Sequence, residues 1–359
     1  MGPMSARFPL HDLHAAAGAT FAAPCGLELP LHYGDAAAEY TAVRQAAGLL
    51  DRSDAGVLEV TGRDRTAFLH AMLSNDIKSL TPGHGGAAAF LDVHGKVQVL
   101  LLVWALEDRL LVLTPHGMAG PTFEMLDKYL FAEKATFRDA TGERSLLMLV
   151  GPEAPALARR LTGAQVPDAS WAHTEATLDG IAVRLVRGGG EIAEIEVWIV
   201  APAEAGPREW RALTAAGVRP VGFTAREALR IEAGTPLYGH DVDETVLLPE
   251  IPSERWISPT KGCYIGQEVV VRIRDRGHVN RHLRGLVFDG EGVPTPGDPI
   301  LAGESEVGRV TSAAWSFGLK RPVALGFVRR QHAEPGTALI VRSDGRLLTA
   351  TVSALPIAR

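Results

Sequence analysis

After about residue 283 the chain becomes a series of short apolar runs separated by glycine, proline and Asp-Gly turns. Short apolar runs between such turns are typical of strands, and Asp344-Gly345 is a strong signal for a hairpin. Several short strands in succession favour a small barrel. We therefore predict a separate all-β domain over residues 283–359, with strands at 286–288, 307–311, 323–328, 339–341 and 347–352.

The preceding residues have a different pattern, in which strand-like and helix-like segments alternate. Residues 57–60 alternate as a strand does, and residues 63–73 place apolar side chains on one helical face. The same strand–glycine–helix order returns at residues 146–161, which suggests two related half-domains. We therefore expect residues 8–282 to form an α+β region of two lobes.

Composition excludes several classes of protein. The chain has 359 residues, of which 46% are hydrophobic and 22% charged, and its net charge is −6. This balance is that of an ordered globular protein, and a net acidic chain repels nucleic-acid phosphates. No segment reaches the roughly 18 to 20 apolar residues of a membrane helix, and no secretory signal is visible. We expect a cytoplasmic protein whose primary partner is neither a membrane nor a nucleic acid.

Only two cysteines occur, Cys25 and Cys263. They are too few for a disulfide framework or a four-cysteine zinc site, and we predict no metal site. Cys263 lies two residues after Lys261, one of only six lysines. A nearby ammonium favours the nucleophilic thiolate, so we predict Cys263 as the functional thiol and Lys261 as its electrostatic activator. The alternative is a buried, inert cysteine in a tight loop.

The residues around Cys263 are suited to a planar ligand. Gly266 leaves room for a ligand to approach, because it has no side chain. Tyr264 offers a face for stacking, and Gln267 and Glu268 offer hydrogen-bond acceptors for ring N–H groups. Residues 261–268 are therefore the segment of the chain where chemistry is most strongly indicated.

Two further segments admit either a structural or a functional interpretation. We expect the Gly188–Gly190 triplet to be a flexible hairpin connection; the alternative is a loop where backbone approaches a ligand closely. Five arginines fall within residues 272–284. We expect them to form a solvated face; the alternative is a subsite for phosphates or for several carboxylates.

The segment Lys261–Glu268 resembles the Lys-Gly-Cys-Tyr-x-Gly-Gln-Glu motif of the folate-binding YgfZ-type proteins, which are accessory factors for iron–sulfur enzyme maturation. The rest of the chain is similar to the wider superfamily of the glycine-cleavage T-protein, an aminomethyltransferase. The segments that carry this similarity are 39–51, 74–77, 229–239 and 307–312.

The resemblance implies a ring of three lobes around a central channel that holds tetrahydrofolate, polyglutamylated forms included. It implies that Asn75 lies in a turn lining the channel and that Arg230 is close to the folate. The family's folate-binding glutamate lies in a Gly-Glu-x-Gly segment, whose counterpart here departs from the pattern and gives Glu191. The cofactor-binding residues predicted in this way are Asn75, Glu191, Arg230, Tyr264, Gly266, Gln267 and Glu268.

The chain departs from the aminomethyltransferase pattern at a position where chemistry is expected. Aminomethyltransferases carry a Gly-Gly-x-x-Asp-Asp segment, whose two aspartates are replaced here by Val99 and Leu100. Neither side chain can accept a proton or stabilise a cation. The usual Ser-His-Met-Gly segment likewise reads Ser53-Asp54-Ala55-Gly56.

The leading hypothesis is a tetrahydrofolate-binding accessory protein that supports assembly or repair of iron–sulfur enzymes. Its expected partners are folate and those enzymes or their assembly machinery, and catalytic turnover is left open. The alternative is a folate-dependent aminomethyltransferase or demethylase, against which the missing aspartates argue. A third hypothesis is a scaffold that binds no folate.

Overall fold

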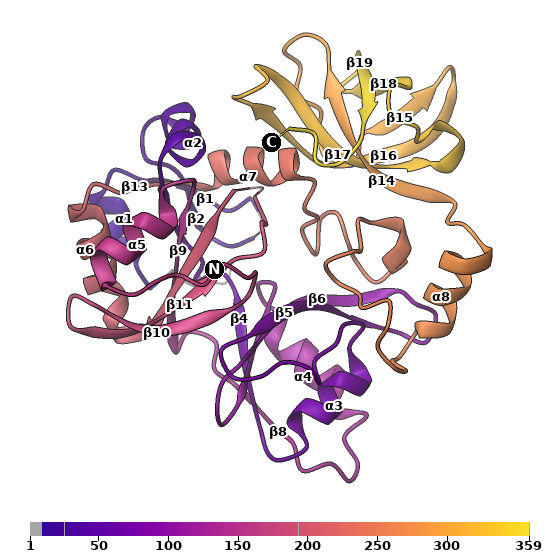
Figure 1. Ribbon diagram of the computed structural model, residues 1–359. Coiled ribbons are helices and arrows are strands. Elements are labelled where there is room, and N and C mark those ends of the chain that lie inside the picture. Colours follow the sequence, from indigo (N-terminus) through magenta and orange to yellow (C-terminus); the bar gives the residue numbers. More distant parts are fainter. Residues whose placement is uncertain (1–8, 25, 193, 359) are drawn as a thin grey trace, which may run out of the picture.

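The computed structural model describes residues 9–24, 26–192 and 194–358. Two α+β lobes and a barrel are arranged around the centre of the molecule, where helix α7 (Phe223–Ala233) runs beneath the barrel (Figure 1). The predicted α+β class with a C-terminal barrel is confirmed. No helix in the described part of the chain is long and apolar enough to cross a membrane.

The first lobe is built on a six-stranded sheet of order β10-β11-β12-β9-β3-β13. Its central strand β9 is buried over nearly its whole length, and the cores on its two faces are separate clusters. Apolar side chains such as Leu157 and Trp210 bring α5 and α6 onto one face. The strands are β3 (Gly48–Asp51), β9 (Arg144–Val150), β10 (His173–Leu178), β11 (Ile181–Arg187), β12 (Glu196–Pro202) and β13 (Arg219–Pro220).

The helices of this lobe are short, and a hairpin extends its N-terminal part. The carboxylate of Asp35 accepts hydrogen bonds from the first amides of α2, as N-caps commonly do. The helices are α1 (His11–Ala16), α2 (Ala36–Gln45), α5 (Ala154–Thr162) and α6 (Gly206–Ala215), the last preceded by a 3₁₀ turn (Ala203–Ala205). The hairpin pairs β1 (Thr20–Ala22) with β2 (Leu29–His32).

The second lobe is a five-stranded antiparallel sheet of order β5-β6-β7-β4-β8. One face packs against α3 and α4 through Phe68, Leu69 and Leu126, and part of the other face turns toward the centre of the molecule. The elements are β4 (Gly56–Thr61), α3 (Arg65–Met72), β5 (Gly85–Leu91), β6 (Val97–Ala105), β7 (Leu110–Thr114), α4 (Ala119–Asp127) and β8 (Thr136–Asp139).

The C-terminal domain is a closed barrel of order β14-β17-β16-β15-β18-β19. At its last hairpin both Asp344 and Gly345 have positive φ, as the predicted Asp-Gly turn requires. The predicted boundary between residues 282 and 283 stays a prediction; β14 begins at Arg281. The strands are β14 (Arg281–Phe288), β15 (Pro299–Ala302), β16 (Ser305–Ser316), β17 (Arg321–Arg329), β18 (Ala338–Ser343) and β19 (Arg346–Ser353), with 3₁₀ turns at Arg330–His332 and, before the barrel, at Leu248–Glu250.

One helix was not predicted, and one local expectation was wrong. The sequence analysis makes no prediction of α8 (Gln267–Arg276), which follows the cysteine segment directly. The Gly188–Gly190 triplet does connect two strands, but a Cβ at Gly188 would overlap Glu196 and one at Gly189 would overlap the Trp171 ring. The connection is therefore closely packed rather than flexible.

Candidate functional site

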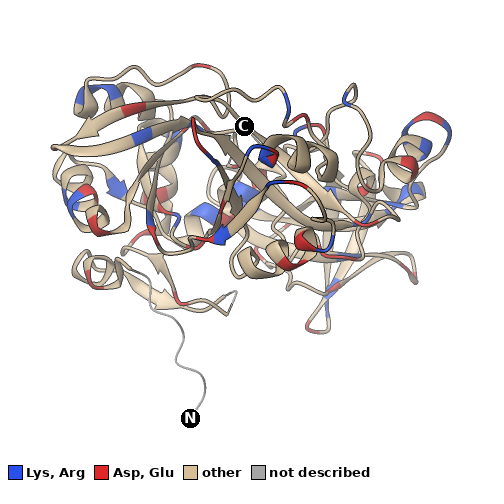
Figure 2. Cartoon of the chain, turned by 90° about the horizontal axis from the view of Figure 1, so that it is seen from below, with Lys and Arg blue, Asp and Glu red and all other residues tan. Residues whose placement is uncertain are grey.

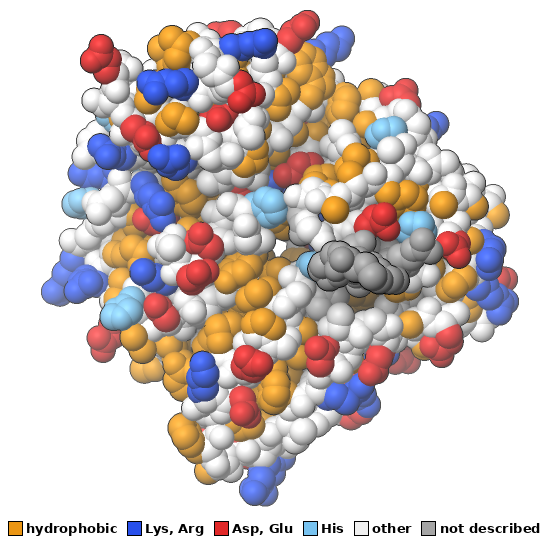
Figure 3. Space-filling model, turned by 180° about the vertical axis from the view of Figure 1, so that it is seen from behind, with side chains coloured by type: hydrophobic (Ala, Val, Ile, Leu, Met, Phe, Trp, Pro, Cys, Tyr) orange, Lys and Arg blue, Asp and Glu red, His pale blue; other side chains and the backbone are white. Residues whose placement is uncertain are grey.

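A cavity of about 370 Å³ lies where α7, the six-stranded sheet and strand β6 meet. Its walls are mainly apolar, and the view from behind shows hydrophobic side chains gathered around the hollowed middle of that face (Figure 3). Concave, mostly apolar sites with a few polar groups are the usual form of small-molecule sites. The apolar lining includes Leu100, Leu102, Trp171, Trp198, Phe223 and Trp256.

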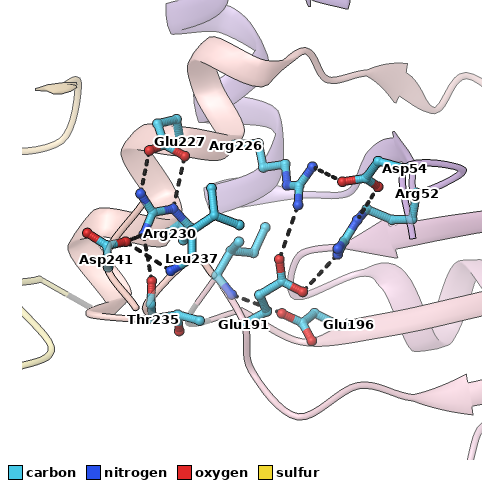
Figure 4. A network of polar contacts seen from close by, with 11 residues as sticks. Arg52, Asp54, Glu191, Glu196, Arg226, Glu227, Arg230, Thr235, Leu237 and Asp241 are labelled. Atoms are coloured by element: carbon cyan, nitrogen blue, oxygen red, sulfur yellow. Dashed lines mark hydrogen bonds and ion pairs between the residues drawn. The ribbon is translucent and has the colours of Figure 1, made fainter. Parts of the chain in front are cut away.

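Two arginines and two carboxylates form a closed network in the cavity wall (Figure 4). Arg52 donates to Glu191 at 2.8 Å and to Asp54 at 3.2 Å. Arg226 donates to the same two residues at 3.4 Å and 3.2 Å. The two carboxylates are supplied by the turn after β3 and by the glycine loop, and α7 supplies Arg226. The four charges balance, so the network can stay buried.

Electrostatics keep both carboxylates of this network ionised. Burial alone would raise the pKa of Asp54, but the guanidinium groups of Arg226 and Arg52 outweigh it and lower that pKa to about 2. Burial likewise acts to raise the pKa of Glu191, but the charges of Arg52 and Arg226 outweigh it and lower that pKa. The guanidinium of Arg52 also lies 4.9 Å from the ring centre of Trp198. Glu191 therefore presents a fixed anionic acceptor at the cavity.

Arg230 lines the same cavity but is only 2% exposed. Its Nε and Nη2 both donate to the Glu227 carboxylate, and Nη2 also donates to the Ser312 hydroxyl at 2.8 Å. Nη1 donates to the Thr235 carbonyl oxygen and to Asp241, each at 2.7 Å (Figure 4). A guanidinium has five N–H donors, and all five are used here. A hydrogen bond from Arg230 to folate, which the resemblance implies, stays a prediction that requires one of these bonds to open.

Asn75 lies behind the cavity wall rather than in it. Its side-chain amide donates to the carbonyl oxygen of Ala87 at 2.7 Å and to that of Arg255 at 3.2 Å. The neighbouring Ser74 hydroxyl donates to the carbonyl oxygen of Trp256 at 2.5 Å. Arg255 and Trp256 both line the cavity, so the turn after α3 fixes the backbone of this part of the wall.

The Lys261 ammonium makes its hydrogen bonds to the second lobe, and its role as electrostatic activator of Cys263 stays a prediction. Its Nζ donates to the carbonyl oxygens of His70 and Leu73, where α3 ends. The ammonium also lies 5.1 Å from the ring centre of Tyr264, and burial lowers the pKa of Lys261 to about 8. Cys263 itself is exposed. Lys261 therefore fastens the cysteine segment to the second lobe.

The other predicted residues of this segment lie outside the cavity lining. Tyr264 is buried, and burial raises its pKa. Gly266 adopts a positive φ of 81° against the Asp92 backbone, where a Cβ would overlap. Gln267 and Glu268 begin α8, and Glu268 is exposed. The predicted residues thus fall in three places: Glu191 and Arg230 at the cavity, Asn75 behind its wall, and residues 261–268 at the edge of the second lobe. Cys25 lies outside the described residues.

The two residues that replace aspartates point to opposite faces of β6. Leu100 lines the cavity, whereas Val99 is fully buried in the core beneath α3 and α4. Only Leu100 therefore removes a charge from the cavity side of the strand.

The five arginines of residues 272–284 are divided between α8 and β14, and three of them have partners. Arg274 pairs with Asp275, Arg281 with Glu250, and Arg284 donates to the carbonyl oxygen of Ala333. Basic and acidic residues are interspersed over the whole chain (Figure 2). In the described part of the chain, no cluster of three His, Cys, Asp or Glu residues could hold a metal ion.

The sequence interpretation did not find Arg52 or Arg226, or assign a role to Asp54. Arg52 and Asp54 directly follow a strand-like run, and Arg226 stands one helical turn before Arg230, so position alone offers a weak signal. Their pairing with Glu191 joins residues up to 139 positions apart and depends on the tertiary fold.

Comparison with known proteins places the chain in a family. The model of the GCVT N-terminal domain matches residues 10–260, and the model of the glycine cleavage T-protein C-terminal barrel domain matches residues 281–358. An aminomethyltransferase of Streptomyces avermitilis is 32% identical over 348 residues, or 93% of each chain. One from Saccharopolyspora erythraea is 32% identical, over 98% of this chain and 97% of its own. The crystal structure of the glycine cleavage system aminomethyltransferase T from Bartonella henselae superposes with a TM-score of 0.88 at 26% identity, covering 98% and 97% of the two chains. The chain therefore belongs to the glycine cleavage T-protein family.

Proposed function

We propose that this chain binds tetrahydrofolate in the central cavity and carries out folate-dependent one-carbon transfer of the aminomethyltransferase type. The relatives reported above are named aminomethyltransferases, which favours this alternative over the accessory role that the cysteine motif suggests. The observation that carries the proposal is the Glu191 carboxylate, held ionised by two arginines in the wall of a mainly apolar cavity.

The cavity suits a flat ring system with polar edges. Each Glu191 oxygen accepts one bond from an arginine and has a further lone pair for a ring N–H group. Three buried donors of the lining have no partner among the described residues: the indole N–H groups of Trp198 and Trp256 and the hydroxyl of Thr235. Buried polar groups normally have partners, and a ligand would reach these three only if the side chains that cover them moved.

Two histidines of the cavity lining are our candidates for the proton transfers of the reaction. Tetrahydrofolate, when bound, supplies the nitrogen atoms that carry the one-carbon unit. The Leu100 side of β6 cannot exchange protons, and Asp54 and Glu191 are held ionised by the arginines. His116 and His240 also line the cavity, and imidazole is the commonest acid–base group in enzymes. We assign the proton transfers of the reaction to these two side chains.

The proposal is tested with purified protein, tetrahydrofolate and an aminomethylated lipoyl carrier protein. Formation of methylenetetrahydrofolate together with ammonia supports aminomethyl transfer, and loss of turnover in His116→Ala or His240→Ala supports the acid–base assignment. Tight folate binding with no turnover on this donor or on a methylamine donor contradicts the proposed reaction.

A second candidate is the accessory role in iron–sulfur enzyme maturation, favoured by the exposed thiol of Cys263. In this role the substrate would be an iron–sulfur enzyme or its assembly intermediate. Complementation of an iron–sulfur maturation defect tests it: Cys263→Ala should abolish complementation while leaving folate affinity unchanged. Full rescue by Cys263→Ala excludes this candidate.

A further inference from the structure

A second cavity, of about 590 Å³, lies between the barrel and the loop that leads away from α7. Residues 239–246 of the loop form one wall, and strands β14, β16 and β17 form the other. We call this cavity the barrel groove. It takes no part in the site described above, apart from Gly239 and His240, which line both. Its charged lining residues are Asp241, Asp243, Arg281, Glu306, Arg309 and Arg329.

The three arginines of the barrel groove stand on one face of three neighbouring strands. Arg281 of β14 lies directly opposite Arg329 of β17, and Arg309 of β16 lies directly opposite Phe327 of β17. Residues opposite each other, and residues two apart on a strand, share a face. The guanidinium of Arg281 also lies 4.4 Å from the ring centre of Phe327. The barrel therefore brings two like charges, Arg281 and Arg329, side by side, which is unfavourable without an anion nearby.

Among the residues that the structure describes, only one of these three guanidinium groups lacks a carboxylate. Arg281 pairs with Glu250 at 3.1 Å, and Arg309 pairs with Glu306 at 2.9 Å. Arg329 makes no ion pair with a described residue, and it is exposed at the end of β17, where it lines the groove. A planar guanidinium is well suited to bind a carboxylate through two parallel hydrogen bonds. The barrel wall thus offers one free site for a carboxylate.

The loop wall offers one free carboxylate. Asp241 is buried and neutralised by Arg230, and both of its oxygens accept further hydrogen bonds. Asp243 is exposed and makes no ion pair with a described residue. Its Oδ1 accepts from the amide and the hydroxyl of Thr245 at 2.8 and 2.6 Å, which leaves Oδ2 available for a cation. The described part of the groove therefore has one unpaired cation and one unpaired anion, on opposite walls.

We infer that the barrel groove binds a small zwitterion of the α-amino-acid class, with its carboxylate at Arg329 and its ammonium at Asp243. A molecule with both charges is complementary to both walls, whereas a simple anion or cation leaves one wall unpaired. Val307 and Phe327 also line the groove and favour an apolar side chain on the ligand. The inference is independent of the proposed function, since no step of it involves folate.

Titration of the isotopically labelled full-length chain, followed by NMR, tests the inference. The probes are L-valine, 3-methylbutanoate, which is valine without its ammonium, and isobutylamine, which is valine without its carboxylate. Valine should shift the amide signals of residues 243–246 and 327–329 saturably. Each single-charge probe should bind roughly 2- to 5-fold more weakly than valine, because one ion pair with an exposed side chain is lost.

Two variants assign the two charges of the ligand. Arg329→Gln should weaken the binding of valine and of 3-methylbutanoate by the same factor but leave that of isobutylamine unchanged. Asp243→Asn keeps an oxygen acceptor for Thr245, and it should weaken the binding of valine and of isobutylamine but leave that of 3-methylbutanoate unchanged. The matched controls are Arg321→Gln and Glu244→Gln, at exposed residues outside the lining, which should bind all three probes as the wild type does.

Three results would overturn the inference. The first is the absence of a saturable shift in the groove below about 10 mM valine. The second is equal affinity of the wild type for valine and 3-methylbutanoate, which would show a site for carboxylates alone. The third is wild-type affinity for valine in both Arg329→Gln and Asp243→Asn, which would show that valine binds elsewhere. None of these results bears on folate, so the proposed function stands or falls separately.

Discussion

The Nη1 atom of Arg230 donates to Oδ2 of Asp241 at 2.7 Å, and this buried ion pair joins α7 to the loop that leads away from it. Asp241 also accepts from the hydroxyls of Thr311 and Ser312 on β16. Arg230 and Asp241 together therefore connect the central helix, the cavity wall and the barrel.

Arg230→Met should destabilise the protein strongly. The substitution leaves the Asp241 carboxylate buried without its cation, and breaking one side of a buried pair costs about 3–5 kcal/mol. Urea unfolding measures the change in the free energy of unfolding. Arg274→Met is the control, since the Arg274–Asp275 pair is exposed to solvent and should contribute little to the free energy of unfolding. Equal effects of the two substitutions would contradict the joining role of Arg230.

Glu209→Gln should stabilise the protein increasingly as pH rises above about 4.5. Glu209 is fully buried in α6, neither carboxylate oxygen has a partner among the described residues, and burial raises its pKa from 4.5 to about 7. Between these two pH values the folded chain holds a proton that the unfolded chain releases, so stability falls as pH rises. Glutamine lacks this loss, and the variant should gain about 1–3 kcal/mol at pH 8 and nothing near pH 4.5.

The measurement for Glu209→Gln is urea unfolding across this pH range. Glu204→Gln, an exposed neighbour in the preceding 3₁₀ turn, should change stability by less than about 0.5 kcal/mol at every pH. A gain from Glu209→Gln that is the same at pH 4.5 and pH 8 would rule out the titration of Glu209 as its cause.

Lys261→Met should loosen the cysteine segment. Methionine keeps the apolar stem but loses the charged donor to the two carbonyl oxygens at the end of α3, a loss of about 1.5–3 kcal/mol for each bond to a charged group that is not replaced. Hydrogen–deuterium exchange of residues 258–266 should become faster, while exchange in the barrel stays unchanged. The exposed Lys78→Met serves as control, and unchanged exchange in Lys261→Met would show that the ammonium does not hold the segment.

Val99→Asp and Leu100→Asp should have very different effects. An aspartate at Val99 places a carboxyl group in the sealed core under α3 and α4, where it has no partner. At Leu100 the carboxyl group reaches the cavity and can be hydrated. Val99→Asp should therefore cost at least about 2 kcal/mol more than Leu100→Asp in urea unfolding. The reverse order would show that the assignment of the two faces of β6 is wrong.

The sequence predicts the barrel strands and the end of α7, because turn residues and a C-terminal glycine mark them locally. The barrel follows from turn residues and short apolar runs. The pattern of residues 224–233 predicts a helix that stops at Gly234, and α7 ends there because Gly234 adopts the left-handed conformation. The sequence pattern of residues 36–49 predicts a helix that ends at Gly48, but α2 stops at Gln45 and Gly48 begins β3. A Cβ at Gly48 would crowd Val43 and Val221, so this glycine serves packing rather than capping.

The site could be predicted only where a residue carries its own signal. Resemblance points to Glu191, and the structure places it at the cavity. The arginines that fix its charge come from distant segments, and no local pattern links them. Lys261 and Cys263 are close in sequence, but the ammonium is drawn to the end of α3, a contact that spans 188 to 191 residues. Spacing along the chain does not reveal that carbonyl oxygens from a distant helix accept hydrogen bonds from this ammonium.

The central claim is that Glu191 receives tetrahydrofolate in the cavity, and calorimetric titration of wild type, Glu191→Gln and Glu194→Gln with tetrahydrofolate tests it most directly. The account predicts saturable one-to-one binding by the wild type and by Glu194→Gln, because Glu194 pairs with Arg44 away from the cavity lining. It predicts a tetrahydrofolate affinity roughly 10- to 100-fold lower for Glu191→Gln. The variant loses the ionised acceptor, and the charges of Arg52 and Arg226 lose one of the two carboxylates that neutralise them. Absence of binding by the wild type, or equal affinity of all three proteins, would contradict the account.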